Sequence, residues 1–173
     1  MRPLRATALT LAWVLLTATA APSAIATPRL SIDSYVVAAH ARDLALGIRG
    51  DSSEEGEQAE LARISGVPEQ RWALGENDIT TLENLGTGKC LRFAMPYTVP
   101  NNPVIQANCD NGDRQTWYYV AADEHFETWR FQNVERDTCI TAVDLAPGAR
   151  LVEAPCDEDD LTQRWTSVEV DEV

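Results

Sequence analysis

The chain has 173 residues, enough for one domain of ordinary size with a buried core. It carries 14 lysine and arginine residues against 27 aspartate and glutamate residues, a formal net charge of −13 at pH 7. A surface this acidic repels nucleic acid and anionic membranes, so we expect neither to be a partner.

Residues 1–26 predict a secretory signal peptide. Two arginines precede an uncharged, largely apolar run over 6–21, and Ala24-Ile25-Ala26 has the small-x-small pattern of a cleavage site. The run is too short to span a bilayer comfortably, and no later segment is apolar enough to insert into a membrane. We therefore expect a secreted, extracellular protein whose mature chain is 27–173. Its strong preference for arginine over lysine suggests a GC-rich, bacterial genome.

Three Gln-x-Trp triplets divide the mature chain into three parts. Their tryptophans are 45 and 48 residues apart, and a repeat of this length predicts supersecondary units that stack around a shared core. We place the repeats at about 30–74, 75–121 and 122–173. The triplets are Gln70-Arg71-Trp72, Gln115-Thr116-Trp117 and Gln163-Arg164-Trp165.

The repetition extends upstream of each triplet. In each repeat a period-two pattern, typical of half-buried strands, ends at a residue six positions before a cysteine or before the residue that replaces it. The segments compared are Tyr35-x-Val37-x-Ala39 before Ala45-Leu46, Thr80-x-Leu82-x-Asn84 before Cys90-Leu91, and Trp129-x-Phe131-x-Asn133 before Cys139-Ile140. The alignment also assigns Glu57 to Arg63, the nearest candidate for a helix, to a strand. These patterns predict an all-β fold.

The repeats resemble those of ricin-type lectin domains. The resemblance rests on the three Gln-x-Trp triplets, on the Asn-to-Cys spacing of repeats two and three, and on a second cysteine before the triplet; repeat one is the degenerate copy. It implies a β-trefoil of twelve strands, with the tryptophans in the core and each glutamine fixing backbone of its own repeat.

Four cysteines in an exported chain indicate two disulfides, with three possible pairings. Cys90 and Cys109 occupy the same two repeat positions as Cys139 and Cys156, as in the bridges within ricin-type repeats. We therefore expect Cys90–Cys109 and Cys139–Cys156. A zinc site is the alternative, but there is no Cys-x-x-Cys spacing, and the two histidines fall outside the cysteine pattern.

Catalytic and metal-binding patterns are weak. Gly50-Asp51-Ser52 lacks the Gly-x-Ser-x-Gly elbow of serine hydrolases, and His40 and His125 have no nucleophile at a recognisable spacing. Asp157-Glu158-Asp159-Asp160 lacks the glycine and terminal glutamate of an EF-hand loop. We expect no catalytic residue, no metal and no cofactor.

The resemblance also identifies the positions that would contact sugar. In sugar-binding ricin-type repeats an Asp follows the first cysteine by two residues, an aromatic precedes the second cysteine, and an Asn precedes the triplet. None of the nine positions retains the expected residue, so the usual galactose pocket is predicted to be absent. The residues found there are Gly47, Arg92 and Thr141, then Ala62, Ala107 and Ala154, then Glu69, Arg114 and Thr162.

Two functions remain open: a carbohydrate-binding module with a divergent site, and a β-trefoil that binds protein, as an inhibitor or a toxin subunit. For the first, repeat two is the candidate, because Tyr97 offers a stacking face beside Asn101 and Asn102, whose amides both donate and accept. Arg92 would favour a carboxylate or sulfate group. Alternatively, Tyr97 covers the disulfide and the asparagines only form a turn. The partner is thus a glycan, a polysaccharide or a protein.

Overall fold

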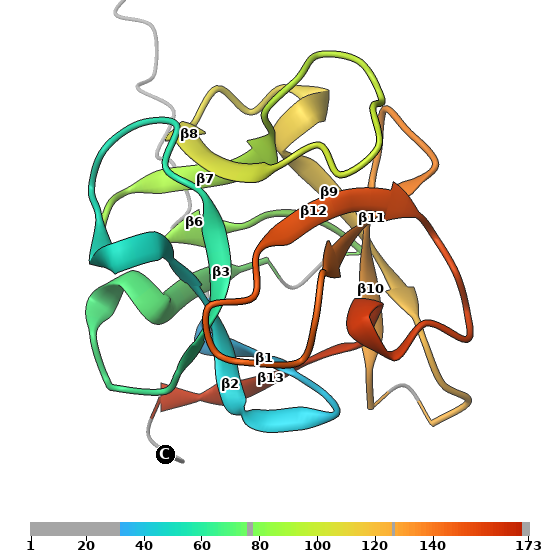
Figure 1. Cartoon of the computed structure of the whole chain (residues 1–173), viewed down its shortest axis with the longest axis horizontal. Helices are drawn as coiled ribbons and strands as arrows, with labels where there is room; N and C mark the ends of the chain where they lie inside the picture. The colour runs from blue at the N-terminus through green and yellow to red at the C-terminus, as the bar shows by residue number, and fades with distance from the viewer. Residues whose placement is uncertain (1–31, 76–77, 126, 171–173) are drawn as a thin grey trace, which may run out of the picture.

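The computed structural model describes residues 32–75, 78–125 and 127–170. These residues form an all-β fold with short 3-10 turns, which Figure 1 traces from the blue N-terminal strand to the red C-terminal strand. The predicted signal peptide lies outside them. In the described part of the chain, no helix is long and apolar enough to cross a membrane.

The chain passes three times through the same pattern of four strands. The first pass comprises β1 (Ile32–Ala38), β2 (Ala41–Ile48), β3 (Ala59–Arg63) and β4 (Arg71–Leu74). The second comprises β5 (Ile79–Thr81), β6 (Glu83–Asn84), β7 (Lys89–Phe93), β8 (Val104–Asn108) and β9 (Thr116–Ala121). The third comprises β10 (Trp129–Asn133), β11 (Thr138–Ala142), β12 (Leu151–Pro155) and β13 (Trp165–Glu169). β3 confirms that the segment with a weak helical pattern is a strand.

Six of these strand positions close into a barrel. β1 pairs with β4 and β13, β9 pairs with β5 and β10, β10 pairs with β13, and β4 pairs with β6, all antiparallel. β5 and β6 are the two parts of one strand, divided at Leu82, which is why thirteen strands stand where the resemblance implies twelve. Closure leaves no open edge in the barrel.

The other strands form the hairpins β2–β3, β7–β8 and β11–β12. Single bridges connect these hairpins to one another, so that each hairpin contacts the other two. The bridges join Gln58 with Ile105, Glu60 with Arg150, and Pro103 with Val152. A barrel with three mutually contacting hairpins is the β-trefoil that the resemblance implies.

The tryptophans of the triplets lie in the centre of the core. Trp72, Trp117 and Trp165 are fully buried, as predicted. Phe93 packs edge-on against Trp117 with ring centroids 5.1 Å apart. The large buried surfaces of these rings make the three tryptophans the main source of hydrophobic stabilisation at the barrel centre.

Repeat one differs by one residue from the register that we predicted. The predicted alignment matched Tyr35, Val37 and Ala39 with Thr80, Leu82 and Asn84, of which Leu82 lies in the main core cluster. In the structure Val36 and Ala38 belong to the main core cluster, whereas Tyr35 and Val37 belong to a second, smaller one. The predicted alignment of this strand is therefore wrong.

Strand pairing shows the cause of the difference. Ala38 pairs with Trp165, just as Asn84 pairs with Trp72, so Ala38 is the true counterpart of Asn84. The pairing of β1 with β2 shifts after Val37, which accommodates one extra residue in the turn. Because side chains alternate along a strand, a shift of one residue exchanges its two faces.

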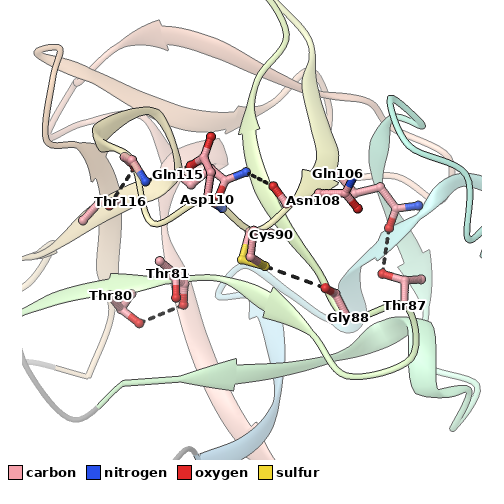
Figure 2. Close-up of a disulfide and its surroundings, with 12 residues drawn as sticks. Thr80, Thr81, Thr87, Gly88, Cys90, Gln106, Asn108, Asp110, Gln115 and Thr116 are labelled. Atoms are coloured by element: carbon pink, nitrogen blue, oxygen red, sulfur yellow. Dashed lines mark hydrogen bonds between the residues drawn. A yellow bond between two sulfur atoms is a disulfide. The ribbon is translucent and has the colours of Figure 1, made fainter.

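Each triplet glutamine lies in a 3-10 turn and holds the segment that precedes the turn. The turns are η2 (Pro68–Gln70), η3 (Asp113–Gln115) and η4 (Leu161–Gln163). In every case Nε2 donates to one carbonyl and Oε1 accepts from the amide two residues later; Figure 2 shows repeat two. The partners are Arg63 O and Ser65 N for Gln70, Asn108 O and Asp110 N for Gln115, and Pro155 O and Asp157 N for Gln163, at 2.8–3.0 Å.

Both predicted disulfides are confirmed. Cys90 is bonded to Cys109 and Cys139 to Cys156, each pair with Cα atoms 5.0 Å apart. Figure 2 shows the first bridge beside the segment that Gln115 holds. Each bridge therefore joins the second strand of its repeat to the segment before the triplet.

Non-reducing peptide mapping of the purified protein is expected to recover only these two linkages. The reason is that the pairing of β7 with β8 and of β11 with β12 brings the two cysteine segments of each repeat together. Thiol titration in denaturant should find no free cysteine before reduction. A peptide containing Cys90 joined to Cys156 would contradict the register of the repeats.

Candidate functional site

The first of the three family positions lies on the second strand of each repeat. It is Gly47 on β2, Arg92 on β7 and Thr141 on β11. A Cβ atom at Gly47 would lie 3.3 Å from Cγ of Gln70, so this position faces the triplet glutamine. Thr141 is buried and its hydroxyl donates to Cys139 O at 3.3 Å. Arg92 alone has a side chain long enough to reach solvent from this position.

The stacking position is equally changed. Ala62, Ala107 and Ala154 lie on the third strand of each repeat, directly opposite Ala45, Cys90 and Cys139. A methyl group cannot provide the aromatic face on which a sugar ring packs. None of the three repeats carries an aromatic ring at this position, and the candidate residues of repeat two lie in the connection of its hairpin instead.

The connection between β7 and β8 carries the candidate residues of repeat two. Tyr97 is 61% exposed and Met95 is 45% exposed, while Asn101 is exposed at the tip of a turn with φ of 56°. The loop thus presents an aromatic ring and an amide to solvent. These two groups provide a stacking surface and hydrogen bonds of the kind that orient a sugar.

Asn102 has a different role. It is fully buried, and its Oδ1 accepts from Met95 N at 2.9 Å while its Nδ2 donates to Glu153 Oε2 at 2.6 Å. Its amide is therefore used inside the protein. We remove Asn102 from the proposed ligand contacts, because a buried and hydrogen-bonded amide cannot also meet a ligand.

A buried ion pair of repeat three fixes this loop. Arg136 Nη1 lies 3.0 Å from Glu153 Oε2, with side chains 8% and 1% exposed. Arg136 Nη2 donates to Met95 O at 3.0 Å, and the Thr98 hydroxyl donates to Glu153 at 3.3 Å. The Thr138 hydroxyl completes the set at 2.8 Å. We call Arg136, Thr138 and Glu153 the loop clamp.

The loop clamp was missed in the sequence, although the repeats contain a signal for it. Gln106 occupies on β8 the place of Glu153 on β12. Its Nε2 donates to Ser52 O and Glu54 O at 2.9 and 2.7 Å, and the Thr87 hydroxyl donates to its Oε1. Thr87 follows Asn84 by three residues, just as Arg136 follows Asn133. The same two positions thus hold the hairpin connection of the preceding repeat. Repeat three replaces a neutral pair by an ion pair, which aligned repeats would have revealed.

The residues considered for catalysis or metal binding lie in surface turns. His40 and His125 are exposed, and in the described part of the chain neither imidazole hydrogen-bonds to a hydroxyl or thiol. Asp160 caps η4 by accepting from Thr162 N at 2.8 Å, and Asp157 accepts from Asp159 N. Among residues 32–75, 78–125 and 127–170, no group of three or more His, Cys, Asp or Glu side chains could hold a metal ion.

Two shifted pKa values belong to the β9–β10 region. Burial raises the pKa of Tyr119 to about 12. A hydrogen bond from the Thr128 hydroxyl, supported by three backbone amides, lowers the pKa of Asp123 to about 2. Asp123 accepts from the amides of the turn that follows it, so its ionised form orders this connection rather than meeting a ligand.

Comparison with known proteins identifies the fold and the family. The family model of the ricin-type beta-trefoil lectin domain matches residues 78–172, more than half of the chain. No curated protein sequence matches the chain. Among solved structures, the designed 3-fold symmetric protein ThreeFoil is 22% identical with a TM-score of 0.72, covering 79% of this chain and 98% of its own.

Two fungal lectins share the fold. The Macrolepiota procera ricin B-like lectin, solved in complex with lactose, has 13% identity and a TM-score of 0.63, covering 79% of this chain and 94% of its own. The Polyporus squamosus lectin, bound to Neu5Aca2-6Galb1-4GlcNAc, has 17% identity and a TM-score of 0.66, with coverage of 80% and 49%. The family match and the closed trefoil agree. The chain belongs to the ricin-type β-trefoil lectin domain family.

Proposed function

We propose that this protein is a secreted carbohydrate-binding module with a divergent sugar site and no catalytic activity. The observation that carries the proposal is the family match over repeats two and three, on a barrel that retains all three triplets. Two disulfides support an extracellular location, because such bonds persist in oxidising compartments. Two fungal lectins with this fold were solved with glycans bound.

The site that we propose lies on the β7–β8 hairpin. Tyr97 provides the stacking face and Asn101 provides hydrogen bonds from the adjacent turn. Arg92 stands where sugar-binding ricin-type repeats carry an aspartate. The clamped backbone favours binding, because a loop held in one conformation loses less entropy when a ligand is bound. Repeats one and three have no comparable side chains at their family positions.

Protein binding is the second candidate function. It is favoured by the loss of the expected residue at all nine sugar-contacting positions and by a net charge of −13. A trefoil that no longer binds sugar would retain its fold and use an acidic face toward a basic partner. In that case the exposed Met95 and Tyr97 would serve as apolar contacts at a protein interface.

A glycan and polysaccharide screen tests the two functions. We expect the purified protein to bind at least one glycan, and Tyr97→Ala to weaken that binding about tenfold through loss of the stacking face. Tyr118→Ala is the matched control, because Tyr118 is 39% exposed on β9, outside the loop. If no glycan binds at any concentration tested, the carbohydrate-binding proposal is wrong and the protein-binding function gains support.

A further inference from the structure

The Arg92 guanidinium has no hydrogen-bond acceptor within the described chain. Its side chain is half-buried, and its Nε is enclosed without a hydrogen-bond partner among the described residues. In repeat one Glu60 stands opposite Gly47, but in repeat two the residue opposite Arg92 is Ile105. The hairpin therefore supplies no carboxylate to this guanidinium. Because Nε is enclosed, an external acceptor would meet the Nη groups of Arg92, which form no ion pair within the described chain.

A second arginine is next to the same glutamine. By the shared register of the hairpins, Arg92 leaves β7 beside Gln115, as Gly47 faces Gln70. Arg114 immediately precedes Gln115 in η3 and, within the described chain, takes part in no ion pair or side-chain hydrogen bond. Both arginines are thus neighbours of Gln115, on β7 and η3, which are in contact with each other.

Two carboxylates share the turn with Arg114. Asp110 Oδ1 accepts from Gly112 N at 2.8 Å, so this carboxylate is directed toward its own backbone. Asp113 is exposed at the start of η3. Neither forms a salt bridge with Arg92 or Arg114, since no pair between them lies within 4.0 Å among the described residues. The two arginines keep their charges free for a ligand.

We infer that this site recognises an acidic glycan, with Arg92 and Arg114 gripping a carboxylate or sulfate group while Tyr97 stacks on a neighbouring sugar ring. The inference rests on the proposed function and specifies its ligand class. A planar guanidinium binds a carboxylate or sulfate through two parallel hydrogen bonds, and such charged bonds are about twice as strong as neutral ones. The net charge of the protein is −13, so most of its surface repels an acidic glycan. Arg92 and Arg114 offer such a glycan two positive charges at the positions that contact sugar in ricin-type repeats.

Calorimetric titration with three oligosaccharides tests this inference. The probes are tetragalacturonic acid, a chondroitin sulfate tetrasaccharide and neutral maltotetraose. We expect an acidic probe to bind and maltotetraose to bind at least about tenfold more weakly. Arg92→Gln and Arg114→Gln should each weaken binding of the acidic probe about tenfold, and Arg92→Lys should lose less because it keeps the charge.

The matched control is Arg42→Gln, which removes the same charge from an exposed arginine of β2 that makes no described ion pair. It should leave the affinity unchanged, and melting curves should show that every variant is folded. Raising the salt concentration should weaken the parent more than Arg92→Gln, because an ionic contact is screened.

The outcomes separate this inference from the proposed function. If acidic probes bind the parent and Arg92→Gln equally well, the arginines are not the site and the inference is overturned. If only neutral glycans bind, the carbohydrate-binding function stands and the acidic specificity is wrong. If no glycan of either kind binds, both the inference and the proposed function fail.

Discussion

Replacing Glu153 by alanine is expected to lower the free energy of unfolding by about 3–5 kcal/mol, the range for breaking a buried ion pair. The Glu153 side chain is 1% exposed and accepts hydrogen bonds from Thr98, Asn102, Arg136 and Thr138. Without it, the buried Arg136 guanidinium keeps only the more exposed Glu135, at 3.8 Å, as an opposite charge, and three neutral donors lose their acceptor. Urea denaturation followed by tryptophan fluorescence measures the effect.

Glu158→Ala is the matched control for this change. The Glu158 side chain is 90% exposed and lies 3.9 Å from Arg130, so its removal should cost no more than a typical surface substitution. Glu153→Gln should fall between the two, because it keeps an acceptor oxygen but removes the charge. Equal stability of Glu153→Ala and Glu158→Ala would show that the clamp contributes nothing to folding.

The clamp also predicts an effect on the loop itself. Glu153→Ala releases contacts to Thr98 and Asn102 on the 94–103 connection, so limited proteolysis should cut this connection faster in the variant than in the parent. The same experiment on Glu158→Ala should give the parent rate. A loop that is cut at equal rates in all three proteins is not held by repeat three.

The second large effect is expected at the barrel centre. Trp117→Ala should lower the free energy of unfolding by about 3–5 kcal/mol, because it removes a fully buried aromatic and leaves a cavity beside Phe93. Trp129→Ala, at a partly buried tryptophan of β10, is the comparison and should cost less. Parent-like unfolding of Trp117→Ala would place this ring outside the core and refute the packing described above.

Hydrogen bonds that cross from one repeat to the next explain why the trefoil folds as one unit. Asn84 of repeat two donates to Glu69 O of repeat one at 2.7 Å, and Asn133 of repeat three donates to Asp113 O of repeat two at 3.0 Å. Each asparagine thus holds the triplet turn of the preceding repeat. At the third junction Ala38 has no side-chain amide, and the strand pairing of β1 with β13 and the backbone bond from Ala39 N to Arg164 O remain.

The features predicted correctly are those that repeat at regular spacing. The triplets, the cysteine pairs and the alternation of core residues recur in repeats two and three, and the structure places them at equivalent points. The first strand of repeat one was misaligned because a single inserted residue in its turn changes neither composition nor alternation. Only the pairing partner of Ala38, which is Trp165 at the other end of the chain, reveals the shift.

The sequence by itself determined the fold and the disulfide pairing, because each depends on residue type at a fixed distance from a repeat marker. The tertiary structure decided which neighbouring side chains face solvent. Asn101 and Asn102 are identical in chemistry, yet one is exposed and the other is buried on Glu153, 51 residues away. Burial depends on contacts between repeats that are distant in sequence, so no local pattern could have separated these two asparagines.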